Sequence, residues 1–350
     1  MTHRAGRRVF QMLAAALLLA GWSGGAAPVQ AAEPVSVGIV GSISDAPFYI
    51  AQAKGFFAAE GLKVTTSNFN SAANMIAPMG TGELDVGAGA VSVGLYNAIA
   101  RGVAIKIVAD KARNSPGYSY SSILVRKALV TSGKVKSFAD FKGLKVAVSG
   151  PGITDLSTID QAMRQGGHSI DDANLVYLGM GQHVAAYANG AIDASLTAEP
   201  STTRILDQGT AVRFASVASF YPNQQTAVVL FSEAFMKKRA VAEKFMRAYL
   251  QAARYYNLAL KDGHYYGARG DEAVDIIAKY SRVKDKALLH RISPNAIDPN
   301  GQLDMHSLAT DLAFFVREGW VKNPDLLKQA VDLSFVTAAA KQLGVASAKP

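Results

Sequence analysis

The chain has no cysteine among its 350 residues. It therefore forms no disulfide bond and no thiolate metal site, and it lacks the residue that carries the lipid of a bacterial lipoprotein. Histidine is also scarce, because only six occur, and they are not spaced as metal ligands such as HxxxH would be. These absences predict a protein without a metal ion and without a cofactor.

The motifs of common catalytic sites are missing as well. Ser149 stands in the sequence VSGPG and not in a GxSxG nucleophile elbow, and the sequence has no GxxxxGK[ST] phosphate loop. The run Gly87-Ala88-Gly89 lacks the third glycine of a dinucleotide-binding fingerprint. The sequence therefore predicts a protein that is not an enzyme.

Long apolar runs and clustered charges are lacking too. No stretch after the N-terminal segment reaches the roughly 18 consecutive apolar residues of a membrane-spanning helix. The formal net charge is +9, but the basic residues are scattered along the chain. Scattered charge favours a solvated surface, with a mild attraction for anions, over a nucleic-acid groove. We therefore expect a protein that binds no nucleic acid and is not embedded in a membrane.

What the sequence does have is an N-terminal segment (1–31) with the features of an export signal. A basic start (Arg4, Arg7, Arg8), an apolar stretch (12–20) and the cleavage pattern Val29-Gln30-Ala31 follow in the order of a signal peptide. We expect cleavage near Ala31, a mature chain with a net charge of about +6, and a periplasmic location. The adjacent arginines leave both the general secretory and the twin-arginine route open.

A strand, a loop and a helix open the mature chain. The apolar residues 35–40 predict a strand, the turn-rich residues 41–45 a loop, and Pro47 the start of a helix that ends at Gly61. In open α/β sheets, small ligands bind at loops between the carboxyl end of a strand and the start of a helix. Binding of a small ligand is therefore the first functional hypothesis.

Similar units recur along the chain. Further strands are predicted within 82–87 and at 104–109, 121–125, 144–148, 175–178, 191–196 and 226–231. Helices are predicted at 138–142, 155–165, 271–280, 284–292, 304–318 and 324–330. Ser232 is the predicted cap of a further, long helix that includes 243–260.

This alternation predicts an α/β fold, and a mature chain of about 318 residues is too long for one compact core. We predict two lobes with a ligand cleft between them. Residues 32–120 and 226–350 would form the first lobe, with the C-terminal helices, and residues 121–225 the second. The chain would cross between the lobes at the strands 121–125 and 226–231.

Six strings resemble bacterial periplasmic substrate-binding proteins of the nitrate/sulfonate/taurine type, whose members include binders of thiamine-precursor pyrimidines. In order they are PFYIAQAKGFF with EGLKV (47–64), GELDVG (82–87), FKGLKVAV (141–148), GAIDA (190–194), Glu199-Pro200 and SEAF (232–235). The resemblance covers most of the mature chain. It implies the two-lobed type II periplasmic binding protein fold, which holds a small solute and presents it to an inner-membrane ABC permease. We expect a monomer.

The first lobe offers two loops to a ligand. We predict contacts from Ser42, Ser44 and Asp45 in the first loop, and from Ala88, Gly89 and Ala90 after the strand of GELDVG. Gly87 and Gly89 suit a close approach of the backbone to a ligand, and a tight turn without a ligand is the alternative.

The second lobe offers the glycine-rich turn SGPGIT (149–154). Ser149, Gly152, Ile153 and Thr154 are its predicted ligand-binding residues. The N–H groups and hydroxyls of this turn precede a helix, and helix N-termini hold anions. The alternative is that Thr154 or Asp155 serves only as the N-cap of that helix.

Aromatic and charged residues complete the predicted site. Tyr118 and Tyr120 suit stacking on a flat ligand, with packing beside the crossing strand as the alternative. Arg113 suits a carboxylate or a sulfonate, with a solvated loop arginine as the alternative. Glu199 would repel an anion and attract an amine or an amidine-like ring. A glutamate before proline is nevertheless common in the resembling family, including members that take anions, so Glu199 does not decide the ligand class.

Basicity and the two tyrosines favour a small organic anion, such as a sulfonate or a carboxylate, with aromatic anions included. A binder of thiamine-precursor pyrimidines and a ligand-binding partner of a membrane sensor remain open. Enzymes on the same fold fit less well. A resembling pyrimidine synthase carries a cysteine cluster that this chain lacks, and menaquinone-route enzymes with this fold work in the cytoplasm, against the export signal.

Overall fold

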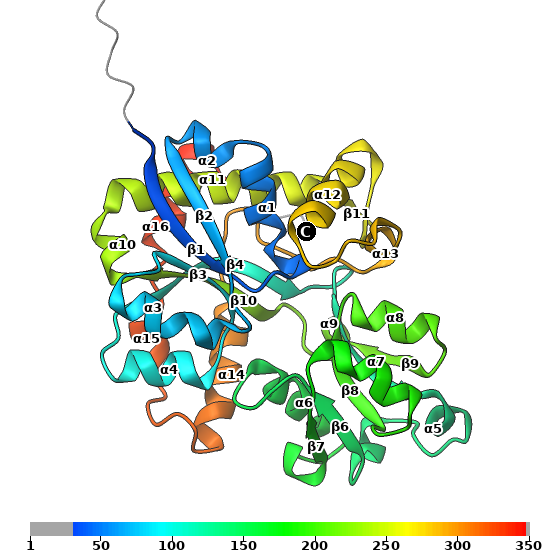
Figure 1. The fold of residues 1–350 in the computed structure, drawn as a ribbon. Helices are drawn as coiled ribbons and strands as arrows, with labels where there is room; N and C mark the ends of the chain where they lie inside the picture. Colours follow the sequence, from blue (N-terminus) through cyan, green and yellow to red (C-terminus); the bar gives the residue numbers. More distant parts are fainter. Residues whose placement is uncertain (1–30, 348–350) are drawn as a thin grey trace, which may run out of the picture. The chain divides into compact units, whose positions relative to one another are not determined.

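The computed structural model describes residues 31–347, so the predicted signal peptide, except its last residue, lies outside the described residues. From Glu33 onward the chain forms one compact unit, and its main strands form two five-stranded sheets (Figure 1). The order of the first sheet is β2 (Leu62–Asn68), β1 (Glu33–Ile39), β3 (Val86–Ala90), β10 (Gln224–Ser232), β4 (Ile105–Asn114). The order of the second sheet is β7 (Asn174–Tyr177), β6 (Lys145–Val148), β8 (Ala194–Ala198), β5 (Ser121–Arg126), β9 (Ala211–Ser216).

Both sheets follow one plan. The first three strands of each order are parallel to one another, and the fourth runs antiparallel to both of its neighbours. That fourth strand, β10 or β5, is the one by which the chain arrives from the other sheet. The predicted α/β class is therefore confirmed, and the structure has strands at both positions where the chain was predicted to cross. We call residues 33–120 and 226–347, with the first sheet, the first half, and residues 121–225, with the second sheet, the second half. Whether the two halves act as separate lobes stays a prediction.

Helices and short 3-10 turns connect the strands. In the first half they are η1 (Ile43–Asp45), α1 (Ala46–Ala53), α2 (Phe56–Ala59), η2 (Ala72–Met75), α3 (Ile76–Thr81) and α4 (Val93–Ala100). Between β5 and β10 they are α5 (Lys127–Thr131), η3 (Phe138–Phe141), α6 (Thr154–Gln165), η4 (Ile170–Asp172), α7 (Met180–Ala188), α8 (Ser201–Asp207) and α9 (Val217–Phe220).

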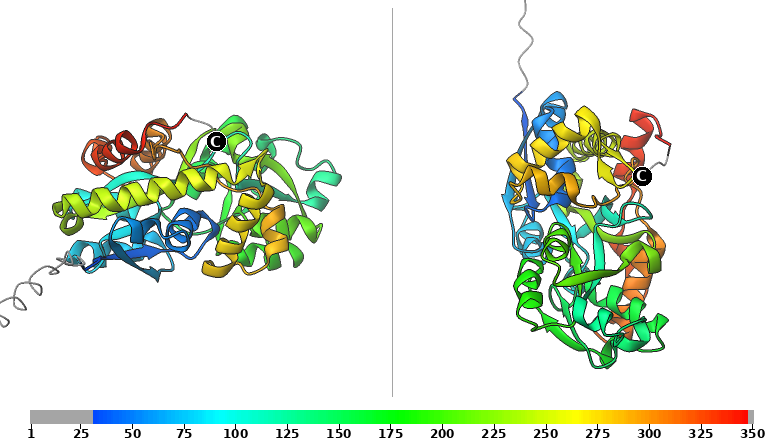
Figure 2. Two further views of the ribbon diagram at one scale, coloured as in Figure 1. Left: turned by 90° about the horizontal axis from the view of Figure 1, so that it is seen from above. Right: turned by 90° about the vertical axis from the view of Figure 1, so that its right-hand side faces the viewer.

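The C-terminal part is almost wholly helical. It contains α10 (Glu233–Lys237), α11 (Arg239–Leu258), the small hairpin β11 (Leu260–Lys261) and β12 (His264–Tyr265), α12 (Gly267–Tyr280), α13 (Lys286–Arg291), α14 (Met305–Arg317), α15 (Leu326–Ala330) and α16 (Ser334–Leu343). The long helix α11 lies beside α16 and α1 (Figure 2). Together with α12, these helices share one hydrophobic cluster with the first sheet.

Two predicted helices differ from the structure. The helix expected to run from Pro47 to Gly61 is broken at Gly55, whose φ of +71° is a left-handed conformation that ends α1 before α2 begins. Ser232 does cap a helix, because its side chain accepts a hydrogen bond from the Phe235 N–H. That helix is the short α10, and the long helix α11 begins later, at Arg239.

Helix α14 joins the two halves. It packs against α6 beside the second sheet and against β10 of the first sheet. Its Phe314 belongs to one hydrophobic cluster with Leu95 of α4 and Leu156 of α6. The apolar core is therefore continuous from one sheet to the other.

A carboxyl group is buried in this junction. Asp311 of α14 is 0% exposed, and its Oδ1 accepts hydrogen bonds from the Ser157 hydroxyl (2.5 Å) and the Tyr221 hydroxyl (2.9 Å). Within residues 31–347 no basic side chain lies within 4.0 Å of it. Burial raises the pKa of Asp311 to about 7, and the two hydrogen bonds lower it only in part.

This pKa predicts a pH-dependent stability. The native Asp311 keeps its proton up to pH ~7, whereas an unfolded aspartate releases it near pH ~3.9, so stability falls as pH rises from about 4 to about 7 and then levels off. Asp311→Asn should be more stable than the wild type at pH 8 and should flatten the pH dependence measured by urea unfolding between pH 5 and 8. Asp325→Asn, at an exposed pair with Lys328, is the control and should keep the wild-type profile. An unchanged profile for Asp311→Asn would contradict the assignment.

Candidate functional site

The turns that follow β3 and β6 meet. The N–H of Val93 donates to the carbonyl oxygen of Gly152 at 2.9 Å, and Ser92 pairs with Ile153 as an isolated antiparallel bridge. Ser92 is also the N-cap of α4, because its Oγ accepts from the Leu95 N–H at 3.2 Å. The carboxyl ends of strands from both sheets are therefore brought together, as the sequence predicts for a ligand site.

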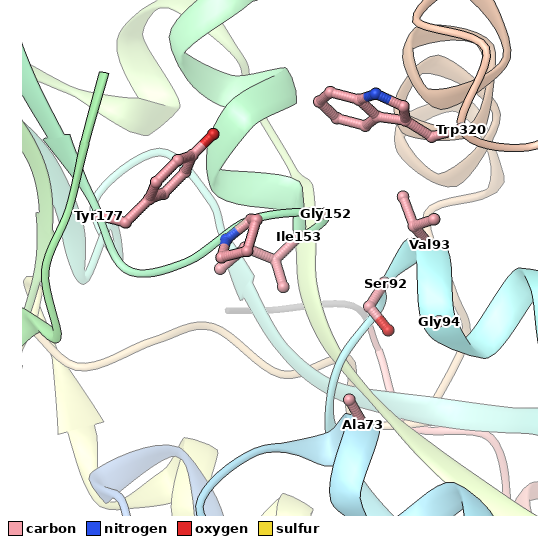
Figure 3. Close-up of a pocket in the computed structure, with 9 residues that line it drawn as sticks. Ala73, Ser92, Val93, Gly94, Gly152, Ile153, Tyr177 and Trp320 are labelled. Carbon is pink, nitrogen blue, oxygen red and sulfur yellow. The ribbon is translucent and has the colours of Figure 1, made fainter.

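A cavity of about 520 Å³ lies at this contact (Figure 3). It is lined by Ala73, Ser92, Val93, Gly94, Pro151, Gly152, Ile153, Tyr177 and Trp320. Its volume is typical of a site for a small organic molecule. Of the predicted ligand-binding residues, Gly152 and Ile153 line it, and none of its nine lining residues carries a charge.

The turn 149–154 holds a carboxylate of its own. Asp155 accepts from both the N–H (3.0 Å) and the hydroxyl (2.5 Å) of Ser149. Burial raises the pKa of Asp155, although these hydrogen bonds lower it in part. The N–H and hydroxyl of Ser149, which the sequence analysis assigned to an anionic ligand, therefore already donate to Asp155.

The N-cap alternative for this turn is wrong. The N-cap of α6 is Ile153, and no side chain accepts a hydrogen bond there. Thr154 is the first residue of the helix and is buried.

The first loop is fixed by a buried ion pair. Lys111 Nζ of β4 lies 2.8 Å from Asp45 Oδ1 and 3.0 Å from Ser44 Oγ, and both charged side chains are 0% exposed. Ser42 contributes its N–H to Asp45 Oδ2 at 2.8 Å, and its hydroxyl lies 2.8 Å from that of Ser44. The three predicted residues are therefore together, but bonded to one another and to Lys111.

Tyr120 and Glu199 lie where the chain passes between the sheets. The Tyr120 hydroxyl donates to Thr226 Oγ1 of β10 at 2.8 Å, and the Tyr120 carbonyl accepts from the Glu199 N–H at 2.9 Å. Burial raises the pKa of Tyr120 to about 12, so its hydroxyl stays a donor at neutral pH. Tyr120 therefore connects the ends of the two sheets.

The Glu199 carboxylate is buried and faces several donors. It accepts from the N–H (3.1 Å) and hydroxyl (2.8 Å) of Thr203, and Arg213 lies 3.6 Å away. Burial raises its pKa, and the Thr203 hydrogen bonds oppose that shift. The Ser293 N–H, from the other half, is 3.5 Å from Glu199 Oε1.

Arg113 and Tyr118 have partners within the protein. Arg113 lies in β4 and not in a loop, its side chain is 17% exposed, and it is 3.1 Å from Asp298 and 3.5 Å from Asp110. The solvated-loop alternative for Arg113 is therefore wrong. Tyr118 is buried in a turn that pairs its backbone with that of Ser115.

The residues at 87–90 have a packing role. Ala88 is 0% exposed inside β3, and a Cβ on Gly89 would lie 2.6 Å from that of Ala72. A Cβ on Gly87 would lie 2.7 Å from the Met79 sulfur. Both glycines therefore let η2 and α3 approach the sheet. The sequence analysis missed this packing role. The tight-turn alternative is wrong, because both glycines lie within β3. Ala90, the last residue of β3, is half-buried.

Sequence reasoning also missed Lys111, Ser92, Tyr177 and Trp320. A lysine within an otherwise buried strand was a usable signal for Lys111, because such a charge needs a partner. Nothing in the sequence marks the other three, since the cavity forms only when distant segments meet.

A further ion pair joins the two halves. Arg291 of α13 makes two hydrogen bonds to Asp207 of α8, at 2.9 and 2.8 Å. Helix α13 packs in the core of the first half, and α8 packs on the second sheet. The contact is exposed, with 55% and 44% of the two side chains accessible.

The fold is that of the periplasmic binding proteins. The chain superimposes on the periplasmic aliphatic sulphonate binding protein SsuA from Escherichia coli with a TM-score of 0.66 at 19% identity, covering 86% of this chain and 92% of that one. It superimposes on the periplasmic nitrate-binding protein NrtA from Synechocystis PCC 6803 with a TM-score of 0.68 at 17% identity, covering 90% of each. The predicted fold is confirmed.

The chain belongs to the NMT1/THI5-like family, whose model matches residues 43–257. It is also 32% identical over 159 residues to a 4-amino-5-hydroxymethyl-2-methylpyrimidine phosphate synthase from Aspergillus parasiticus. That match covers 44% of this chain and 42% of the synthase.

Neither a membrane span nor a metal-ligand cluster is found in the described part of the chain. Its helices are too short or too polar to cross a bilayer. Its histidines and carboxylates form no group of three or more that could hold a metal ion.

The Lys111–Asp45 pair predicts a large effect of one substitution. Lys111→Met leaves the Asp45 carboxylate buried without its cation, which should lower the free energy of unfolding by about 3–5 kcal/mol. The double variant Lys111→Met/Asp45→Asn removes that stranded charge and should recover part of the loss. Urea unfolding measures both. Lys328→Met, at an exposed pair, should have no measurable effect, and an equally small effect of Lys111→Met would refute the prediction.

Proposed function

We propose that this protein is the solute-binding component of an ABC importer, exported to the periplasm as a monomer, and that it delivers a small organic solute to a permease. The observation that carries the proposal is the hydrogen bond from Val93 to Gly152 beside a cavity of about 520 Å³. A solute that touches both strand-end turns would stabilise the closed arrangement over an open one. The permease would then recognise the closed form.

The charges around the site favour a particular solute class. Lys111, Arg113 and Arg213 each lie within 4.0 Å of a carboxylate of the protein itself. Asp155 already occupies the Ser149 donors. A strong anion would therefore have to displace internal partners. We propose a neutral or weakly basic ring, such as a pyrimidine, ahead of the sulfonates and carboxylates that composition favours.

The partial similarity to a pyrimidine phosphate synthase supports the same solute class. The synthase reaction is not part of the proposal, because the match covers only 42% of the synthase. The proposed role is binding without chemistry.

A thermal-shift screen tests the function. The panel contains 4-amino-5-hydroxymethyl-2-methylpyrimidine, benzenesulfonate, ethanesulfonate, benzoate, succinate and nitrate. A solute that binds only the native state stabilises it by about 2.7 kcal/mol at a hundredfold excess over Kd, so a true solute should raise Tm. We expect the pyrimidine to give the largest shift. A largest shift with a sulfonate or carboxylate would refute the solute class, and no shift across the panel would refute the function.

The Arg291–Asp207 pair gives a second test. If closure accompanies binding, Asp207→Asn should lower the affinity for the best solute roughly two- to fivefold at low salt, a small effect because exposed pairs contribute little. At 0.5 M salt, which screens the pair, the loss of affinity should be smaller. Titration calorimetry measures the change. Glu243→Gln, which breaks a pair inside α11, is the control. Equal affinities of Asp207→Asn and the wild type at low salt would contradict closure through this contact.

A further inference from the structure

We propose that Tyr177 and Trp320 hold the planar ring of the solute between them as an aromatic clamp. This inference rests on the proposed solute-binding function and deepens it, because it assigns two ligand-binding residues and the shape of the ligand. Both residues line the cavity beside the Val93–Gly152 contact (Figure 3).

Trp320 is exposed yet held in place. Its ring packs edge-on against Phe314, with centroids 5.6 Å apart and an interplanar angle of 83°. Its backbone N–H donates to the Phe315 carbonyl at 2.9 Å, and its backbone carbonyl accepts from the Asn97 side chain at 3.0 Å. Trp320 is nevertheless 37% exposed, and it lines the cavity.

Tyr177 approaches from the second sheet. It is the last residue of β7, where its backbone is paired with Val148 of β6, and it is 49% exposed. In Figure 3 the two rings lie on different sides of the cavity, which Gly152 and Ile153 also line. Two large aromatic side chains exposed at one cavity are unusual, since burial would normally stabilise them.

The rest of the cavity suits a ring and not a charged group. Its remaining lining consists of small or aliphatic residues and one serine, whose Oγ already accepts from the Leu95 N–H. Aromatic faces attract other π-systems through offset or edge-to-face contacts. Because one ring comes from each half, a bound ring would also link the two halves at this point.

The test uses the emission of Trp320. The sequence contains only two tryptophans, Trp22 and Trp320. In a Trp22→Phe variant of the full chain, every indole signal comes from Trp320, whether or not the N-terminal segment is removed. The aromatic probes are 4-amino-5-hydroxymethyl-2-methylpyrimidine, benzamide and benzenesulfonate. Cyclohexanecarboxamide and cyclohexanesulfonate are the saturated analogues of the last two.

We expect at least one aromatic probe to quench or shift the Trp320 emission. That probe should also bind at least threefold more tightly than its saturated analogue. The pyrimidine, which has no saturated analogue in the set, is compared with both saturated compounds. Tyr177→Leu should lower the affinity for that probe roughly three- to tenfold. Trp320→Leu, followed by calorimetry, should do the same. Tyr266→Leu is the matched control, because Tyr266 is 62% exposed and does not line the cavity. All three sites are exposed, so the variants should fold.

Three results would overturn the clamp: no aromatic probe binds, a saturated analogue binds as tightly as its aromatic partner, or Tyr177→Leu leaves affinity unchanged. Failure of the clamp is distinguishable from failure of the function. A solute from the thermal-shift panel that binds wild type and both leucine variants equally refutes the clamp and leaves the binding function standing. Absence of binding by every compound in both sets refutes both.

Discussion

The structure depends on two strands that each enter a sheet from the other half of the chain. β10 and β5 lie inside their sheets, so both edges of each must find backbone partners, and each finds them in antiparallel neighbours. This pairing fixes where the parallel strands of the two sheets end. The turns after β3 and β6 therefore meet, and Tyr120, beside the crossing, is bonded to Thr226 on one side and to Glu199 on the other.

Charge is distributed in a way that composition does not reveal. The net charge of +9 suggests an attraction for anions, yet the basic groups near the strand ends are engaged by Asp45, Asp298 and Glu199. A buried ion pair contributes little net stability because desolvation offsets attraction. The Lys111–Asp45 pair instead holds the first loop against β4, and what remains at the cavity is uncharged surface.

The sequence predicts the fold well and the site only in part. Apolar runs locate β4, β6 and β10, because burial on both faces demands such runs. The glycines at 150 and 152 locate the turn 149–154. They do not predict that the Asp155 carboxylate accepts hydrogen bonds from Ser149, because that depends on tertiary geometry. The role of Gly89 depends on Ala72 packing above it, and Trp320 reaches the cavity only through α14. Pairwise contacts between distant segments leave no local pattern in the chain.

The contact between Val93 and Gly152 uses backbone atoms alone. Its donor exists with any residue except proline at position 93, and its acceptor with any residue at 152, provided that the turn keeps the left-handed conformation at Gly152, whose φ is +67°. Mutation can therefore change the side chains around the cavity, and with them the choice of ligand, without deleting the groups that join the two halves. Such a separation between the joining contact and the surface around the cavity would let one scaffold diversify among many ligands over evolutionary time.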